Sequence, residues 1–190
     1  EGGIRIPYIV SWPGHVAGGR TDDRQVSTLD VVPTAAALAG ATLPADRSYD
    51  GINLIPYLTG VQAGLPHPVL YWRAGVNYAI RDGSWKMWIA NRAPASVKVK
   101  PLTDSFRVDK RVQPPADANA KIGAEGQVVM LYDLSKDIGE TKNLAVSQSA
   151  VVDRLRKKLN SWDAIMESPQ WASERQSYYY YRGEVLQLFD

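Results

Sequence analysis

Cysteine is absent from the 190-residue chain. Its absence excludes a disulfide framework, a zinc site built on thiolates and a cysteine nucleophile. It does not identify the compartment, because secreted proteins also fold without disulfides. The chain begins at Glu1 without a methionine, so we expect it to be part of a longer protein whose targeting segment lies elsewhere.

Long apolar runs and an excess of one charge are also missing. No uninterrupted apolar run approaches the ~20 residues that cross a bilayer, so we expect no membrane span. Lys and Arg number 22 and Asp and Glu number 20, which gives a formal net charge of +2. This balance provides no reason to expect nucleic acid or an anionic membrane as a partner.

Histidine is scarce, with only His15 and His67 in the chain. A metal site needs further ligands at strand or helix spacing, such as a second His or a carboxylate two or four residues away. Neither histidine has such a neighbour. We therefore predict a surface or loop role for both and no metal site in this chain. The pair Asp22-Asp23 is expected to be solvated, because calcium needs about six to eight oxygen ligands in one place.

The first third of the sequence predicts a strand followed by a helix. Ile6–Trp12 is a short apolar run before Pro13-Gly14 and is typical of a buried strand that ends in a turn. A helix should begin at Asp30 as N-cap and end at Gly40 in the left-handed conformation. One more helical turn is expected over Leu54–Leu58. This order is typical of the edge of an α/β domain.

The rest of the sequence predicts a small antiparallel sheet with a long amphipathic helix over Ser149–Met166. Ala93–Gln127 is rich in proline and predicts a surface excursion, and Tyr178–Asp190 predicts a last strand or a docked tail. Asp82-Gly83 is a strong hairpin signal between two of the strands. The four expected strands are Val69–Trp72, Tyr78–Arg81, Trp85–Ile89 and Val128–Leu134.

Three groups of segments carry a family resemblance through their order and spacing. In sequence order they are Glu1-Gly2-Gly3-Ile4-Arg5-Ile6-Pro7 with Ser11-Trp12-Pro13-Gly14; Ser27-Thr28-Leu29-Asp30-Val31-Val32-Pro33-Thr34 with Leu38-Ala39-Gly40 and Asp50-Gly51-Ile52-Asn53-Leu54; and Ala79-Ile80-Arg81-Asp82-Gly83-Ser84-Trp85-Lys86 with Leu131-Tyr132-Asp133-Leu134 and Gly139-Glu140-Thr141-Lys142-Asn143-Leu144. Each alone is weak. Together they resemble the C-terminal part of the formylglycine-dependent sulfatases, which are arylsulfatases of the alkaline-phosphatase-like superfamily.

The resemblance implies an α/β fold with an α+β C-terminal part. Residues 1–65 would form the end and edge of the α/β sandwich. Residues 66–190 would form a small subdomain with a four-stranded antiparallel sheet packed on a long helix. The family also suggests a periplasmic or secreted protein.

The resemblance places the chemistry outside this chain. In the family, a Cys or Ser in a Cys-x-Pro-x-Arg-like motif becomes formylglycine, and Asp and Asn oxygens hold a calcium ion. These residues precede the Glu-Gly-Gly segment, and the last of them, a Lys, lies a few residues before it. We therefore expect no catalytic residue, metal or cofactor in this chain, which would be inactive alone. The expected partners are the missing N-terminal catalytic domain and, for the parent protein, a sulfated small molecule or glycan.

Five residues are candidates for supporting roles. The resemblance implies that the hairpin over residues 72–78 points toward the active-site cleft, and Gly75 at its turn should leave its neighbours projecting from the tip. Trp72 offers a face for a sugar or aryl ring, Arg73 a fork for a sulfate or carboxylate, and Asn77 a hydrogen bond to a hydroxyl. Glu1 and Arg5 would position the family's Lys, or would form an ordinary charge pair at a turn.

Two rival functions stay open. A noncatalytic glycan- or protein-binding module would be favoured if the gene began just upstream of Glu1. A phosphatase or phosphodiesterase of the same superfamily is disfavoured, because those enzymes take metal-binding His and Asp residues from this later part of the chain. Neither the individual sulfate ester nor the oligomeric state follows from the sequence.

Overall fold

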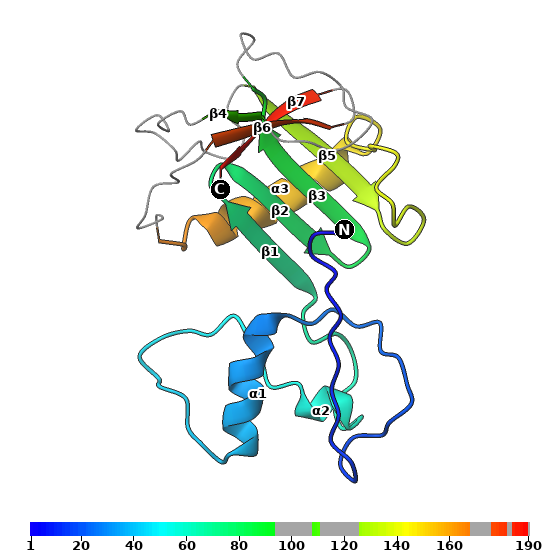
Figure 1. The fold of residues 1–190 in the computed structure, drawn as a ribbon, viewed down its shortest axis with the longest axis vertical. Coiled ribbons are helices and arrows are strands. Elements are labelled where there is room, and N and C mark those ends of the chain that lie inside the picture. The colour runs from blue at the N-terminus through cyan, green and yellow to red at the C-terminus, as the bar shows by residue number, and fades with distance from the viewer. Residues whose placement is uncertain (94–107, 111–125, 168–175, 182–183, 190) are drawn as a thin grey trace. The chain divides into compact units, whose positions relative to one another are not determined.

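The computed structural model describes residues 1–93, 108–110, 126–167, 176–181 and 184–189 (Figure 1). The chain divides into two compact units. One contains Gly2–Pro68, and the other contains Val69–Asp190 together with Glu1. The chain therefore passes from one unit to the other at Glu1-Gly2 and again at Pro68-Val69.

The larger unit is built on a four-stranded antiparallel sheet, as the sequence predicts (Figure 1). Tight turns at Gly75 and Gly83 join its first three strands, and both glycines have a positive φ, at 58° and 61°. The predicted long helix is α3, Ser149–Asp163, and it crosses one face of the sheet (Figure 1). The strands in spatial order are β1 Val69–Ala74, β2 Asn77–Asp82, β3 Trp85–Asn91 and β5 Gln127–Asp133.

Alternation along the strands gives the sheet two apolar faces. The helix face holds a buried cluster formed by Tyr78, Ile80, Met87, Ile89, Leu131, Val152, Leu155 and Leu159. The opposite face holds a second buried cluster formed by Ala90, Val128, Met130, Tyr132, Leu134 and Leu186. At the helix-face margin, Lys158 donates to Asp82 at 2.7 Å.

A second antiparallel sheet contributes to the opposite face. Its order is β4 Val108–Lys110, β6 Gln176–Tyr181 and β7 Glu184–Phe189, and Leu186 of β7 is fully buried. The C-terminal segment is thus a hairpin of two strands, where the sequence predicted one strand or a docked tail. Most of the predicted excursion over Ala93–Gln127 lies outside the described residues.

The smaller unit has little regular structure. It contains a 3₁₀ turn, Thr28–Asp30, followed by α1, Val31–Leu38, and later α2, Ile55–Leu58. Gly40 and Gly60 follow the two helices with φ of 63° and 80°, so both helices end in the left-handed conformation expected of glycine.

One prediction for this unit was wrong, and another was right in position but not in mechanism. Ile6–Trp12 is an exposed extended segment and not a buried strand, and the Ile9 side chain is 89% exposed. A strand needs a neighbour for its backbone groups, and no described strand pairs with this segment. Asp30 is the N-cap position of α1, as predicted, but its side chain makes no capping bond to that helix. Ser27 caps the preceding 3₁₀ turn, and Asp30 bonds back to the Ser27 amide in a capping box.

Candidate functional site

A group of four charged side chains, only slightly exposed, lies in the larger unit. Arg81 of β2 and Lys86 of β3 are direct partners in the antiparallel register. Lys86 Nζ lies 2.6 Å from Glu140 Oε1 and 3.2 Å from Glu1 Oε1, and Arg81 Nη1 lies 3.5 Å from Glu1 Oε2. Lys86, Glu1 and Glu140 have side chains that are 9%, 6% and 14% exposed. We call these four residues the Glu1 cluster.

Within the cluster, the electrostatics favour the charged forms of Lys86 and Glu140. Burial lowers the pKa of Lys86, but hydrogen bonding to Glu140 and the nearby carboxylates outweigh it, so the net pKa is raised. Burial raises the pKa of Glu140, and the hydrogen bonds and charges of Lys86 and of the Glu1 α-ammonium reverse this to a net lowering. The cluster can therefore hold a carboxylate firmly, but it contains no activated nucleophile.

The loop that carries Glu140 is ordered by Asp137. The Asp137 carboxylate accepts hydrogen bonds from the backbone of Thr141 and Lys142 at 2.9 and 2.8 Å, and the Glu140 amide donates to the Asp137 carbonyl. Glu140 has a φ of 52°, the left-handed region that costs energy for a residue with a Cβ. The loop thus presents the Glu140 carboxylate to Lys86 at the expense of backbone strain.

The two N-terminal candidates from the sequence belong to different units. Glu1 lies in the cluster, whereas Arg5 belongs to the unit of residues 2–68 and is exposed. The sequence reasoning missed the roles of Arg81, Lys86 and Glu140. A signal was present, because a lysine at a strand position between apolar neighbours is expected to have a buried charged partner.

The hairpin candidates do not converge on one point. Arg73 lies on the helix face, where its guanidinium pairs with Asp163 at 2.9 Å and donates to the Glu167 carbonyl at 2.6 Å. Asn77 is 5% exposed and donates to the Gln187 carbonyl of β7 at 3.0 Å. Trp72 is half-buried, and its place next to Arg73 in the strand puts it on the opposite face of the sheet.

The expectation that these residues project from the tip was wrong. The turn itself is Gly75-Val76, and Val76 is buried at 2% exposed. Trp72 and Arg73 pair with Ala79 and Tyr78 inside the ladder, so the residues beside the glycine pack within the unit. A tight two-residue turn shortens the tip and leaves its flanking residues in the sheet.

The smaller unit has a buried polar centre at Asp30. Asp30 is fully buried and accepts hydrogen bonds from the amides of Ser27 and Ile52 at 2.7 and 2.9 Å. Its Oδ1 also lies 2.8 Å from Nε2 of His67, which is 7% exposed. His67 is in a loop as predicted, but it is buried and not at the surface. Gly51 allows this approach, since a Cβ there would lie 2.0 Å from the Leu29 carbonyl oxygen.

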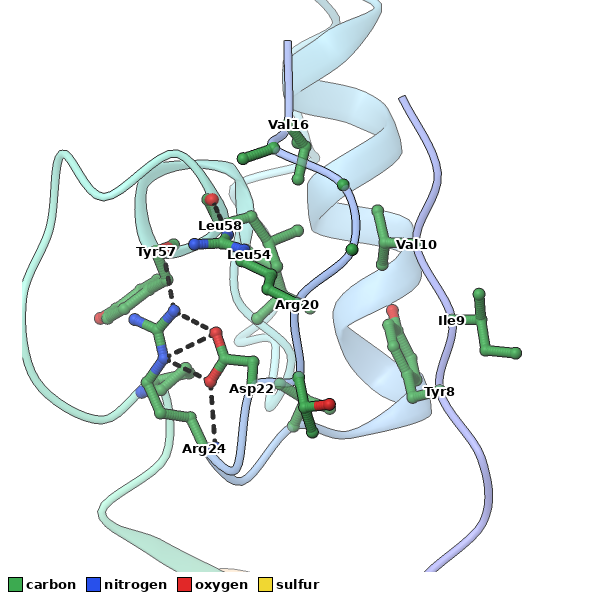
Figure 2. Close-up of a pocket in the computed structure, with 16 residues that line it drawn as sticks. Tyr8, Ile9, Val10, Val16, Arg20, Asp22, Arg24, Leu54, Tyr57 and Leu58 are labelled. Atoms are coloured by element: carbon green, nitrogen blue, oxygen red, sulfur yellow. Dashed lines mark hydrogen bonds and ion pairs between the residues drawn. The ribbon is translucent and has the colours of Figure 1, made fainter. Parts of the chain in front are cut away.

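A cavity of about 370 Å³ opens on the same unit (Figure 2). Its apolar lining includes Tyr8, Val10 and Leu54. The two arginines beside it are engaged with the protein: Arg24 pairs with Asp22 and donates to the Tyr57 carbonyl at 2.9 Å, and Arg20 donates to the Leu58 carbonyl (Figure 2). The cavity suits an apolar group better than an anion.

Within the described ranges, no three His, Asp or Glu side chains converge as a metal site. The helices that the structure describes are all too short or too polar to cross a membrane.

Sequence comparison finds relatives for most of the chain. It is 35% identical over 157 residues to arylsulfatase A of Bos taurus, a match that covers 80% of the chain. It is also 35% identical over 150 residues to arylsulfatase A of Homo sapiens, covering 76% of the chain. These matches span only 28% and 27% of the two relatives. No protein-family model matches the chain.

A solved structure agrees with these relatives. The crystal structure of Ps i-CgsB superposes with a TM-score of 0.57 at 25% identity. The match covers 86% of this chain and 30% of that one. In sequence and in structure, therefore, the chain spans less than a third of each of these three proteins.

Proposed function

Because the chain belongs to the sulfatase family and corresponds to its C-terminal part, we propose that its parent protein hydrolyses sulfate esters. One observation carries the proposal: 35% identity to an arylsulfatase along 80% of the chain. The described mixture of helices with a four-stranded antiparallel sheet agrees with a sulfatase-like α/β fold.

The chain's own part in this function is structural. In the proposed arrangement, residues 1–65 complete the edge of an alkaline-phosphatase-like sandwich, and residues 66–190 form the small subdomain beside the cleft. The partner is the N-terminal catalytic domain. Two features support this partner: the exposed apolar side chains of Ile9, Val31 and Val32, and the apolar cavity beside Tyr8.

The nucleophile and metal of the parent belong to the N-terminal domain in this proposal. Formylglycine would supply the nucleophile, and calcium would stabilise charge on the sulfate. In support of this assignment, the chain has no cysteine as a formylglycine precursor, and within its described residues no three His, Asp or Glu side chains come together. Its contribution is to hold the catalytic domain and to close one side of the cleft.

Substrate contacts are proposed for the hairpin of β1 and β2. Trp72 is half-buried and could contact a ring, whereas Arg73 would first have to leave Asp163 and Asn77 would have to leave the Gln187 carbonyl. In the parent enzyme, Arg73→Ala should lower kcat/KM by roughly ten- to a hundredfold on a substrate with a second anionic group, since an Arg–anion contact contributes about 1.5–3 kcal/mol. A small neutral aryl sulfate should lose much less. Equal losses on both substrates would show that Arg73 acts through stability and not recognition.

Assays of a generic aryl sulfate test the main proposal. The parent protein should turn it over, and the purified 190-residue chain should not. Sulfatase activity in the chain alone, surviving removal of contaminating enzyme, would contradict the assignment of the chemistry to the missing part. An inactive parent that binds glycans would favour the noncatalytic module, and turnover of phosphate esters alone would favour the phosphatase.

A further inference from the structure

Two cations face each other on the sheet surface opposite α3. Arg81 and Lys86 are direct cross-strand partners, and their side chains lie on the same face. Like charges in this position repel each other, and Lys86 has also lost most of its contact with water. The pair is stable only if carboxylates lie beside it.

The Glu1 carboxylate bridges these cations. One oxygen lies 3.2 Å from Lys86 Nζ and the other lies 3.5 Å from Arg81 Nη1. With Glu140, two carboxylates balance two cations, so removal of Glu1 would leave a net charge of +1 in a buried site. The Glu1 α-ammonium also lies 2.7 Å from Glu140, but in a longer protein this nitrogen is a peptide nitrogen, so only the side chain carries the argument.

The strained backbone of Glu140 points to a required position for its carboxylate. Among the residues that the structure describes, Glu140 alone has a positive φ without being glycine. Such a conformation costs of order 1–3 kcal/mol and persists where the surroundings fix it. Here the Asp137 carboxylate fixes the loop and leaves Glu140 aimed at Lys86.

We propose that Arg81, Lys86 and Glu140 form a carboxylate-binding latch that fixes Glu1 on the larger unit. Of the residues before Val69, Glu1 alone belongs to the larger unit. The latch therefore fixes the last residue of that unit before the chain continues into the smaller unit at Gly2. Lys86 is then a positioning residue: it sets where the segment around Glu1 runs. Its importance for catalysis rests on the proposed function, whereas the latch itself does not.

The latch can be tested in the 190-residue chain by ¹⁵N relaxation at the Gly2 amide. An N-terminal acetyl group removes the α-ammonium charge and should leave Gly2 ordered, with an order parameter near 0.85. In the acetylated chain, Glu1→Gln or Lys86→Met should lower it below about 0.6, and Lys86→Arg should largely restore it. Lys136→Met, which removes an exposed lysine paired with Asp133, is the matched control and should change nothing.

A double-mutant cycle of Glu1→Gln and Lys86→Met should show coupling of about tenfold or more in the folding equilibrium constant. If the Lys86→Met variant does not fold, the cycle can be measured with Arg81→Met in its place, because Arg81 also contacts the Glu1 carboxylate. A mobile Gly2 in the acetylated wild-type chain, or a rigid Gly2 in Glu1→Gln, would overturn the latch.

In the parent enzyme, Lys86→Met should lower kcat by about tenfold or more with a smaller change in KM, and Lys86→Arg should recover much of the loss. A wild-type parent without sulfatase activity would contradict the proposed function and leave the relaxation result standing. If the parent is active and Lys86→Met leaves its kcat unchanged, the latch has a structural role only.

Discussion

Residues 69–190 and residues 2–68 bury their apolar side chains to very different extents. The larger unit encloses two apolar clusters, with Ile80, Ile89 and Leu155 fully buried. In the smaller unit the fully buried positions include the carboxylate of Asp30, while Ile6 and Val32 are 60% and 59% exposed. One unit therefore has the core of an independent domain, and the other has a polar centre surrounded by apolar surface that lacks a cover.

The difference indicates where each unit obtains its stability. Burial of apolar area contributes roughly 25 cal/mol per Å², so the larger unit gains most from its own core. The smaller unit gains less from burial and relies on the hydrogen bonds of Asp30. Its exposed apolar residues are those expected of a surface that a larger protein covers.

The largest effect should come from the core of the larger unit. Leu155→Ala removes a fully buried side chain between α3 and the sheet, and it should lower the free energy of unfolding by about 2–5 kcal/mol. Hydrogen exchange read by mass spectrometry should assign this loss to residues 69–190. Ile165→Ala, at a position 76% exposed, should cost less than about 0.5 kcal/mol. If residues 2–68 lose protection equally, the two units do not unfold separately and the contrast between them fails.

A smaller loss, confined to the other unit, is expected from Asp30→Ala. The substitution leaves the amides of Ser27 and Ile52 without their acceptor and removes the partner of His67, at a cost of about 1–3 kcal/mol. Exchange should increase in residues 2–68 alone. Asp46→Ala removes the exposed pair with Arg47 and should have little effect. Equal effects of the two substitutions would contradict the claim that the hydrogen bonds of Asp30 stabilise this unit.

The fold of the larger unit was largely predictable because its signals are local. Short runs of apolar and aromatic residues between turn signals predicted the strands, and Asp82-Gly83 marked a hairpin turn. The helix was clear from the spacing of Val152, Leu155 and Leu159. A sulfatase-like assignment also followed from the order of short motifs, and the arylsulfatase relatives confirm it.

The contacts of the site were not predictable in the same way. The bond from Lys86 to Glu140 joins a strand to a distant loop, and no local pattern specifies it. The strand predicted over Ile6–Trp12 failed for a related reason: its apolar content favours a strand, but pairing requires a neighbour that the described part of the chain does not provide. The roles of Trp72, Arg73 and Asn77 remain predictions.

The smallest expected effect is a pH dependence of the stability of the smaller unit, caused by an ion pair at its surface. The pKa of Asp22 is lowered to about 2, chiefly by the hydrogen bond from the Arg24 side chain. An unfolded Asp titrates near 3.9, so the folded carboxylate contributes stability above that pH and loses it as the pH falls through about 2. The contribution should be at most about 1 kcal/mol, because the pair lies at the surface with side chains 24% and 30% exposed, where solvent screens it.

A carboxyl-carbon NMR titration of Asp22 measures this shift directly. In Arg24→Gln the pKa should return toward about 3.9, and Asp22→Asn should flatten the stability of residues 2–68 between pH 4 and pH 2 by the same small amount. A loss of several kcal/mol in this window that disappears in Asp22→Asn would mean that a surface ion pair, and not the buried Asp30 centre, holds the smaller unit together. The contrast between a unit with its own core and a unit that depends on buried polar bonds would then have to be drawn differently.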